Sequence, residues 1–371
     1  RMNKILDFNP ADRQVICEPG VVTEQLQQCA EQQDLFYPVD FASSGSSQLG
    51  GNVSTNAGGI KVIRYGMTRE WIKGMKVVTG SGELLDLNRG LNKNATGYDF
   101  RHLFIGAEGT LGFIVELTVA LTNKPKDPTV LMLGVEKMEQ IMQVLQAFQG
   151  KLDLTAFEFF SEKALKHVIE EKQLQRPFAT EPDFYALVEF ENNSEQDMDT
   201  AMHLFETCLE EGWVVDGTIS QNSTQANNLW RLREDISETI SKFTPYKNDI
   251  SVKVSKVPEF LREVDSLVTS VYPDFEIIWF GHIGDGNVHL NILKPDALAA
   301  EAFFEECSKV SDLVFEIVAK HGGSISAEHG VGLLKKPFLH YSRSASEIAY
   351  MKAIKKIFDP KNIMNPGKLF D

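Results

Sequence analysis

The chain has 371 residues, of which 43% are hydrophobic, so it is long enough for two or three domains with apolar cores. Its 52 acidic and 37 basic residues give a formal charge of −15, which argues against nucleic acid and against charge-driven binding to an anionic membrane. The four cysteines are widely spaced and form no CxxC motif, and the sequence shows no membrane-length apolar run and no signal peptide. These features predict a soluble protein of the reducing cytoplasm.

Along the chain, residues 1–122 are predicted to form a glycine-dense domain with short strands at 75–79 and 113–117. A linker at Lys124–Pro128 follows, and strands then alternate with helices over a second region, residues 123–340. Its predicted strands are 130–135, 156–160, 184–190 and 214–219. One helix is predicted between the first strand and about residue 150, another after residue 160, and two more at 197–211 and 225–243. Repeated βα units on one sheet account for this alternation. In the remainder, residues 341–371, Ser344 and Glu347 predict a capping box at the start of a helix that ends near 357.

Two histidines flank a predicted turn. His282 and His289 are seven residues apart and would point to opposite faces of an uninterrupted strand. The glycines and aspartate of 284–286 predict a turn between them, which lets both rings face one point. Glu328 and His329 follow about forty residues later. Two imidazoles and a carboxylate could bind a divalent metal, with another histidine left for proton transfer.

The alternative is that these are core histidines beside a buried, paired glutamate. On the predicted strand 288–292, Asn291 shares a face with His289, which makes it a candidate for orienting a substrate or ligand.

Small residues gather in two stretches of the first domain. Ser43–Ser47, Gly50–Asn52 and Asn56–Gly59 form one, and Lys93–Asp99 with Gly106–Gly112 form the other. Such residues let backbone N–H groups approach phosphate or the polar edge of a flavin. The pattern is not a GxGxxG Rossmann turn, and plain surface loops remain the alternative.

Taken together, the motifs resemble one family over essentially the whole chain. They are Gly50–Asn52 through Gly58–Gly59, Arg64–Gly66, Lys93–Asp99, Gly106–Gly112, Trp230–Glu234, Gly281–His289, Glu328–Gly330 and Asn365–Lys368. In this order they resemble the FAD-linked 2-hydroxy-acid dehydrogenases of the vanillyl-alcohol-oxidase-like fold. That group includes D-lactate dehydrogenases, glycolate oxidase subunits and D-2-hydroxyglutarate dehydrogenases.

The resemblance implies an α+β fold in two domains. One is an FAD-binding domain, to which the C-terminal segment returns, and the other is an α/β cap with an antiparallel sheet flanked by helices. Relatives place a first glycine-rich pyrophosphate loop before the position where this sequence begins, so residues 1–122 correspond to the second part of the flavin domain. The residues implied to bind FAD are Pro38, Ser44, Gly50, Gly51, Asn52, Thr55, Asn56, Gly58, Gly59, Glu108, Gly109, Gly112, Ile114 and Asn365.

The resemblance also assigns roles in the cap. His282, His289 and Glu328 would bind the metal, with zinc expected and manganese or cobalt as alternatives that nitrogen and oxygen ligands permit. His329 would be the general base. The implied substrate-binding residues are Arg233, Ser237, Lys247 and Asn291. An arginine that holds a carboxylate by two hydrogen bonds favours a diacid substrate.

The expected activity is therefore FAD-dependent oxidation of a D-2-hydroxy acid, first of all D-2-hydroxyglutarate to 2-oxoglutarate. Electrons would pass to an electron-transfer flavoprotein or a quinone, and a homodimer is left open. D-lactate or glycolate oxidation is the alternative within the family. Outside it, a flavin-free zinc hydrolase or a non-catalytic subunit would account for some of the same residues.

Overall fold

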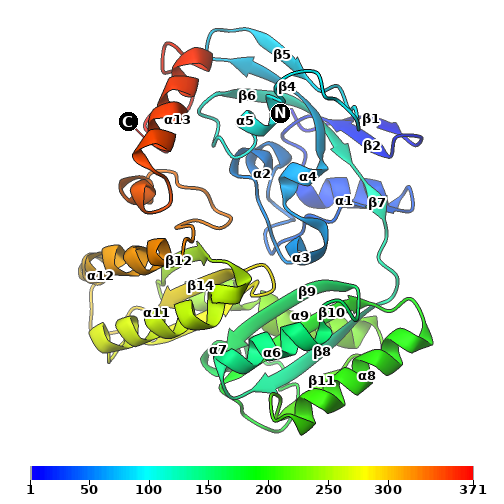
Figure 1. Ribbon diagram of the computed structural model, residues 1–371, viewed down its shortest axis with the longest axis vertical. Coiled ribbons are helices and arrows are strands. Elements are labelled where there is room, and N and C mark those ends of the chain that lie inside the picture. Colours follow the sequence, from blue (N-terminus) through cyan, green and yellow to red (C-terminus); the bar gives the residue numbers. More distant parts are fainter. Residues whose placement is uncertain (1, 371) are drawn as a thin grey trace. The chain divides into compact units, whose positions relative to one another are not determined.

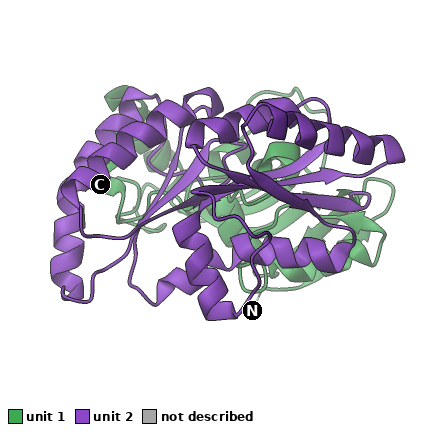
Figure 2. Ribbon diagram, turned by 90° about the horizontal axis from the view of Figure 1, so that it is seen from below, with its two compact units in different colours: residues 1–124, 328–371 green, residues 125–327 purple. Residues whose placement is uncertain are grey.

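The structure is a computed structural model that describes residues 2–370. The chain forms two compact units, which Figure 2 colours separately. Unit 1 comprises residues 1–124 and 328–371, and unit 2 comprises residues 125–327. The predicted divisions lie after residues 122 and 340. The second division falls earlier because residues from 328 onward bond to unit 1: Gly59 donates its N–H to Glu328 at 2.8 Å, and Val331 donates to Glu108 at 2.6 Å.

Unit 1 is built on a five-stranded antiparallel sheet in the order β1-β2-β6-β4-β5 (Figure 1). Its strands are β1 (Ile5–Asn9), β2 (Gln14–Cys17), β4 (Ile72–Thr79), β5 (Leu84–Leu87) and β6 (Gly112–Ala120), with β3 (Leu35–Phe36) and β7 (Thr122–Asn123) as a separate pair. The helices are α1 (Thr23–Glu31), α2 (Leu49–Thr55), α3 (Val62–Tyr65), α4 (Thr68–Trp71), α5 (Arg101–Phe104), η2 (Lys336–Tyr341) and α13 (Ala345–Phe358). The two strands predicted in this region are confirmed as parts of β4 and β6.

The C-terminal segment packs into unit 1. Helix α13 begins at the predicted capping box, with Ser344 and Glu347 bonding to each other's backbone N–H. At its end, buried Asp359 accepts hydrogen bonds from Lys355 and from the backbone of Ile363 and Met364. These bonds satisfy the carboxylate and fix the turn that leads into the Asn365 loop.

Unit 2 contains a seven-stranded antiparallel sheet in the order β11-β8-β10-β9-β13-β14-β12. Its strands are β8 (Pro128–Val135), β9 (Leu154–Ser161), β10 (Phe184–Glu191), β11 (Asp216–Ile219), β12 (Tyr246–Ser251), β13 (Ile277–Gly281) and β14 (Asn287–Ile292). The helices are α6 (Met138–Phe148), α7 (Glu162–Lys172), α8 (Glu195–Glu210), α9 (Ser223–Glu234), α10 (Ile236–Ser241), η1 (Val254–Lys256), α11 (Val257–Val271) and α12 (Ala300–Lys320). The mixed α+β class and the antiparallel cap sheet match the expectation.

Helices cover both faces of the unit 2 sheet, as Figure 2 shows. Contacts link α6 with α8 and α11, and α11 with α12, whereas α7 contacts α9 and α10. Every residue of β9 is buried, because its strand lies inside the sheet between the two helical layers. A strand covered on both faces needs apolar side chains throughout, so a charged residue within it is costly unless it is paired.

The predicted helix 225–243 is wrong in one respect, because it is two helices. Helix α9 ends at Glu234 and α10 begins at Ile236, with Asp235 between them. Glycine and proline are absent from this stretch, so the break had no signal of the kind that ends helices.

Within residues 2–370, no helix combines the length and apolar character that crossing a membrane requires.

Candidate active site

A cavity of about 690 Å³ lies within unit 1. Seven of the residues predicted to bind FAD line it: Gly50, Gly51, Glu108, Gly109, Gly112, Ile114 and Asn365. The cavity is also lined by residues that were not predicted from the sequence: Met2, Pro19, Gly20, Gln48, Ser54, Phe113, Ile363 and Met364. Gln48, Phe113 and Met364 directly precede or follow a predicted motif, so proximity to these motifs was the available signal for them.

Small residues are required around this cavity for different reasons. A β-carbon on Gly50 would lie 2.7 Å from that of Pro19, so close packing of the chain excludes a side chain there. A β-carbon on Gly51 would meet no atom within 4 Å, although Gly51 lines the cavity. Glycine at 51 therefore keeps space open for a ligand rather than for the chain's own packing.

The Glu108 loop joins the cavity to the C-terminal segment. Glu108 and Asn365 both have left-handed backbones, with φ of 51° and 40°. The Asn365 side chain donates to the Glu108 carbonyl at 2.6 Å, while the Glu108 carboxylate accepts the N–H groups of Val331 and Gly332. The C-terminal segment is thus tied to the wall of the cavity by hydrogen bonds.

The other predicted flavin-binding residues serve local structure. The buried Asn52 amide donates to Thr23 Oγ1 at 2.7 Å, and Ser44 donates to Asp40. Thr55 donates to the Gly51 carbonyl within α2. Asn56 ends α2 in a left-handed conformation and accepts the N–H of Arg69.

Pro38, Gly58 and Gly59 complete this group. Pro38 is buried. A β-carbon on Gly58 would lie 3.0 Å from a Glu328 oxygen, and one on Gly59, whose φ is +110°, would lie 2.0 Å from the Asp40 carbonyl oxygen. Flavin binding by these residues stays a prediction.

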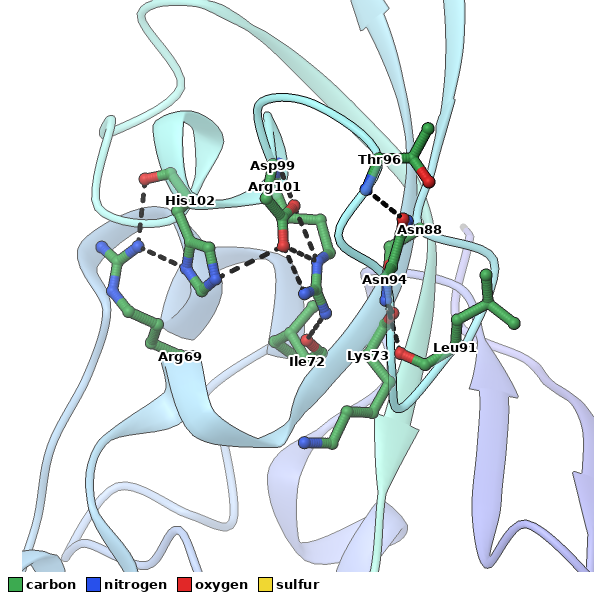
Figure 3. A network of polar contacts seen from close by, with 10 residues as sticks. All are labelled: Arg69, Ile72, Lys73, Asn88, Leu91, Asn94, Thr96, Asp99, Arg101 and His102. Atoms are coloured by element: carbon green, nitrogen blue, oxygen red, sulfur yellow. Dashed lines mark hydrogen bonds and ion pairs between the residues drawn. The ribbon is translucent and has the colours of Figure 1, made fainter.

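The second small-residue stretch, Lys93–Asp99, is exposed and mainly bonds to its own neighbourhood (Figure 3). Asn94 donates to Asn88, and Asp99 accepts from Arg101 at 3.0 Å. The same network contains Arg69 and His102, joined at 3.0 Å through His102 Nδ1. Burial and the nearby arginines lower the pKa of His102 below its ordinary value.

In unit 2, the predicted turn between the two histidines is confirmed. Gly286 has a φ of +87°, and Asp285 accepts the backbone N–H of Asn287, two residues later, at 3.1 Å. The turn connects β13 to β14 and brings the rings of His282 and His289 to 5.4 Å between centroids, nearly perpendicular to each other. Both residues are more than nine-tenths buried.

Strand pairing places further polar groups on the same face as these rings. His289 pairs with Asp249, and Asn291 pairs with Lys247, because directly opposed residues in an antiparallel ladder share a face. One residue was missed: Glu158 of β9, whose side chain is 1% exposed. Its two oxygens each lie 2.8 Å from His282 Nδ1.

Arg233 is the second partner of Glu158. Its Nη2 lies 2.8 Å from Glu158 Oε2, and its guanidinium sits 4.9 Å from the centre of the Phe280 ring. Yet neither Nε nor Nη2 has an aligned hydrogen-bond acceptor within residues 2–370, and Arg233 is 5% exposed. The Asn291 side-chain amide, also buried, likewise has no acceptor there. Buried donors without acceptors are costly, and an anionic ligand would satisfy both.

Lys247 and Ser237 are less enclosed. Lys247 is exposed, but partial desolvation of its ammonium group lowers its pKa. Ser237 is half-buried in the first turn of α10, after the helix break.

The remaining predicted residues belong to unit 1. Glu328 is half-buried and accepts the Gly59 N–H, while His329 is exposed. His282 and His289 belong to unit 2. The grouping of all four residues in one centre stays a prediction.

Comparison with known families accounts for both units. The family described as FAD linked oxidases, C-terminal domain, matches residues 124–369, and the FAD binding domain family matches residues 1–88. The chain belongs to the FAD-linked oxidase family. It is a flavin-dependent enzyme similar to the D-2-hydroxyglutarate dehydrogenases, and FAD is the cofactor of this family. Membership favours a flavoenzyme over the zinc hydrolase and the non-catalytic subunit considered from the sequence.

Several curated proteins resemble this FAD-linked oxidase over its whole length. A D-2-hydroxyglutarate dehydrogenase from Stutzerimonas stutzeri is 63% identical, covering 100% of this chain and 80% of the relative. One from Xanthomonas citri is 53% identical, covering 100% and 78%. A putative mitochondrial D-lactate dehydrogenase from Schizosaccharomyces pombe is 35% identical, covering 99% and 71%.

Solved structures show the same fold. A 4-ethylphenol oxidase from Gulosibacter chungangensis has a TM-score of 0.74 at 16% identity, covering 100% of this chain and 79% of that one. An alkyldihydroxyacetonephosphate synthase has a TM-score of 0.71 at 17% identity, covering 99% and 67%. The fold is therefore vanillyl-alcohol-oxidase-like, as the motifs implied.

Proposed function

We propose that this enzyme oxidises D-2-hydroxyglutarate to 2-oxoglutarate. The names and high identity of the two bacterial relatives support this substrate. The observation that carries the proposal is the buried Arg233, whose Nε has no hydrogen-bond acceptor among the described residues. A guanidinium in this state can bind a second carboxylate, which a hydroxyglutarate has and a lactate lacks.

The space beside the glycines of the unit 1 cavity supports FAD binding there. The open space beside Gly51 and Gly109, where an added β-carbon would meet no atom closer than 3.9 Å, allows the close backbone approach that a large polar ligand needs. FAD, when bound, supplies the acceptor for the hydride equivalent removed from the substrate.

His282 and His289 also fit a metal ion. Their rings are adjacent and buried, and the Glu158 carboxylate at Nδ1 leaves the Nε2 lone pair of His282 as a ligand. We include Glu328 as the third ligand on the strength of its motif. Zinc is the first expectation, with manganese or cobalt as alternatives, and such an ion supplies Lewis-acid chemistry at the substrate hydroxyl.

The chain's own residues bind and orient the substrate in this proposal. Arg233 would hold the distal carboxylate, and Lys247 and Ser237 would add polar contacts to it. The Asn291 amide would donate to the carboxylate or hydroxyl next to the reacting carbon. His329 would accept the hydroxyl proton at an imidazole nitrogen as general base.

The partners and the location are also part of the proposal. An electron-transfer flavoprotein or a quinone would reoxidise the flavin, and a homodimer stays open. A cytoplasmic location is supported by the four cysteines, which are all unpaired thiols.

D-lactate is the second candidate substrate, because the chain is 35% identical to the putative D-lactate dehydrogenase of S. pombe. The test is dye-coupled oxidation of D-2-hydroxyglutarate, D-malate and D-lactate, with a chelated sample and a His329→Ala variant as controls. Preference for the five-carbon diacid, lost on chelation and in the variant, supports the proposal. Preference for D-lactate would overturn it. D-malate is the closest competitor, since one methylene contributes only about 1–3 kcal/mol of discrimination.

A further inference from the structure

We propose that Glu158 is a positioning residue that orients both the metal ligand His282 and the substrate-binding Arg233. This inference rests on the proposed function, because it takes His282 to be a metal ligand. It concerns a residue outside the family motifs, on strand β9, whose carboxylate is 1% exposed. Burial of a lone carboxylate is too costly to occur without partners, so what pairs with Glu158 indicates what it is for.

The contact with His282 fixes a tautomer. Both Glu158 oxygens lie 2.8 Å from His282 Nδ1, so the ring donates a proton from Nδ1 to the carboxylate. A neutral imidazole protonated at Nδ1 carries its lone pair on Nε2, the atom that would bind a metal ion. By contrast, His289 Nδ1 lies 3.8 Å from Asp249 Oδ1, beyond hydrogen-bond distance. Of these two carboxylates, Glu158 makes the closer contact with a ring.

The contact of Glu158 with Arg233 compensates the positive charge of the guanidinium without using all of its N–H donors. Glu158 Oε2 lies 2.8 Å from Arg233 Nη2, and the ring of Phe280 lies against the guanidinium at 4.9 Å. The carboxylate therefore compensates the charge of a guanidinium that is 5% exposed. Arg233 Nε has no hydrogen-bond acceptor within residues 2–370 and so remains available to a ligand carboxylate. One carboxylate thus holds two groups that act on opposite ends of the substrate.

The neighbouring strand offers a matched control. Glu189 of β10 is also buried, at 5% exposed, and it accepts hydrogen bonds from Trp230 Nε1 at 2.7 Å and from Thr155. These two donors are a tryptophan and a threonine rather than a predicted ligand or substrate residue. Glu189→Gln therefore removes a buried carboxylate charge without removing the proposed positioning.

The test measures zinc affinity of the flavin-loaded, chelator-stripped enzyme by competition with a fluorescent zinc chelator. Loss of an outer-shell partner of a metal ligand lowers affinity by about 10- to 100-fold, and we expect a loss in this range for Glu158→Gln. Glu158→Asp keeps the charge but shortens the side chain, so we expect a smaller loss. Glu189→Gln should leave the zinc affinity unchanged even if it lowers the melting temperature.

The outcomes separate this inference from the proposed function. If His282→Ala leaves zinc affinity unchanged, the metal assignment itself fails. If His282→Ala abolishes zinc binding while folded Glu158→Gln and Glu158→Asp bind zinc as the wild type does, only the role of Glu158 is overturned. An equal loss of affinity in Glu189→Gln would also overturn it, because any buried carboxylate would then have the same effect. Should Glu158→Gln not fold, Glu158→Asp alone decides between these results.

Discussion

The two units of this enzyme offer different kinds of groups to their ligands. Unit 1 offers backbone and empty space, with glycines where a side chain would fill the cavity or strike the chain. Unit 2 offers buried side chains, in which Glu158 contacts both His282 and Arg233 on a sheet covered by helices. Backbone sites depend on single residue types at fixed positions, whereas side-chain sites depend on partners that are remote in the sequence. Mutations should therefore act differently in the two units.

The largest effect is expected at Gly59. Its φ of +110° and the 2.0 Å approach of an added β-carbon to the Asp40 carbonyl mean that Gly59→Ala must displace the backbone. A strained backbone of this kind costs about 1–3 kcal/mol before the clash is counted. We expect little soluble, flavin-loaded protein, measured by expression and the flavin-to-protein absorbance ratio. Gly82→Ala, also at positive φ but with no neighbour within 4 Å, should be milder. Equal behaviour of the two variants would contradict this account of Gly59.

Breaking the buried pair in unit 2 comes next. Arg233→Met or Glu158→Gln alone leaves an uncompensated buried group, and removing one partner of a buried pair costs about 3–5 kcal/mol. The double variant should lose clearly less stability than the sum of the two single variants. Urea unfolding of all four proteins measures the coupling. Additive losses would mean that Glu158 and Arg233 do not interact in solution.

A smaller and more selective effect is expected at Gly51. Because its added side chain meets open space, Gly51→Ala should not destabilise the fold, and alanine is favoured over glycine in a helix by about 1 kcal/mol. A larger residue, as in Gly51→Val, should instead weaken FAD binding. Flavin titration together with thermal unfolding of the apoprotein separates the two effects. Normal FAD affinity in Gly51→Val would show that this part of the cavity does not hold the cofactor.

The smallest effect concerns the C-terminal segment of unit 1. Burial opposes ionisation of Asp359, but the bonds from Lys355 and from two backbone N–H groups outweigh it, and the pKa of Asp359 falls below its ordinary value of 3.8. An acid whose pKa is lower in the folded than in the unfolded chain stabilises the fold. This stabilisation is complete when the pH lies above the unfolded-state pKa, and it is lost as the pH falls through the folded-state pKa. The stability difference between wild type and Asp359→Asn should therefore be constant at neutral pH and shrink below pH about 4. A difference that grows on acidification would contradict the assigned contacts.

The same contrast explains what could be predicted. Glycines and the turn at 284–286 are local signals, so the sequence located several cavity residues and the hairpin that joins the two histidines. Glu158 lies 124 residues from His282 and belongs to none of the motifs. Its only signal was a single charge within Thr155-Ala156-Phe157-Glu158-Phe159-Phe160, a buried apolar strand. The break at Asp235 was missed because residues 225–243 contain no glycine or proline to mark it.

The measurement that tests the central claim most directly is the specificity ratio of Arg233→Met. It compares kcat/KM for D-2-hydroxyglutarate with kcat/KM for D-lactate in the wild type and in the variant. If Arg233 binds the second carboxylate, its loss should cost about 2 kcal/mol or more for the diacid alone, which reduces the ratio by roughly 30-fold or more. A ratio that stays the same while both activities fall would contradict the claim, because Arg233 would then support the structure of the site without recognising the diacid.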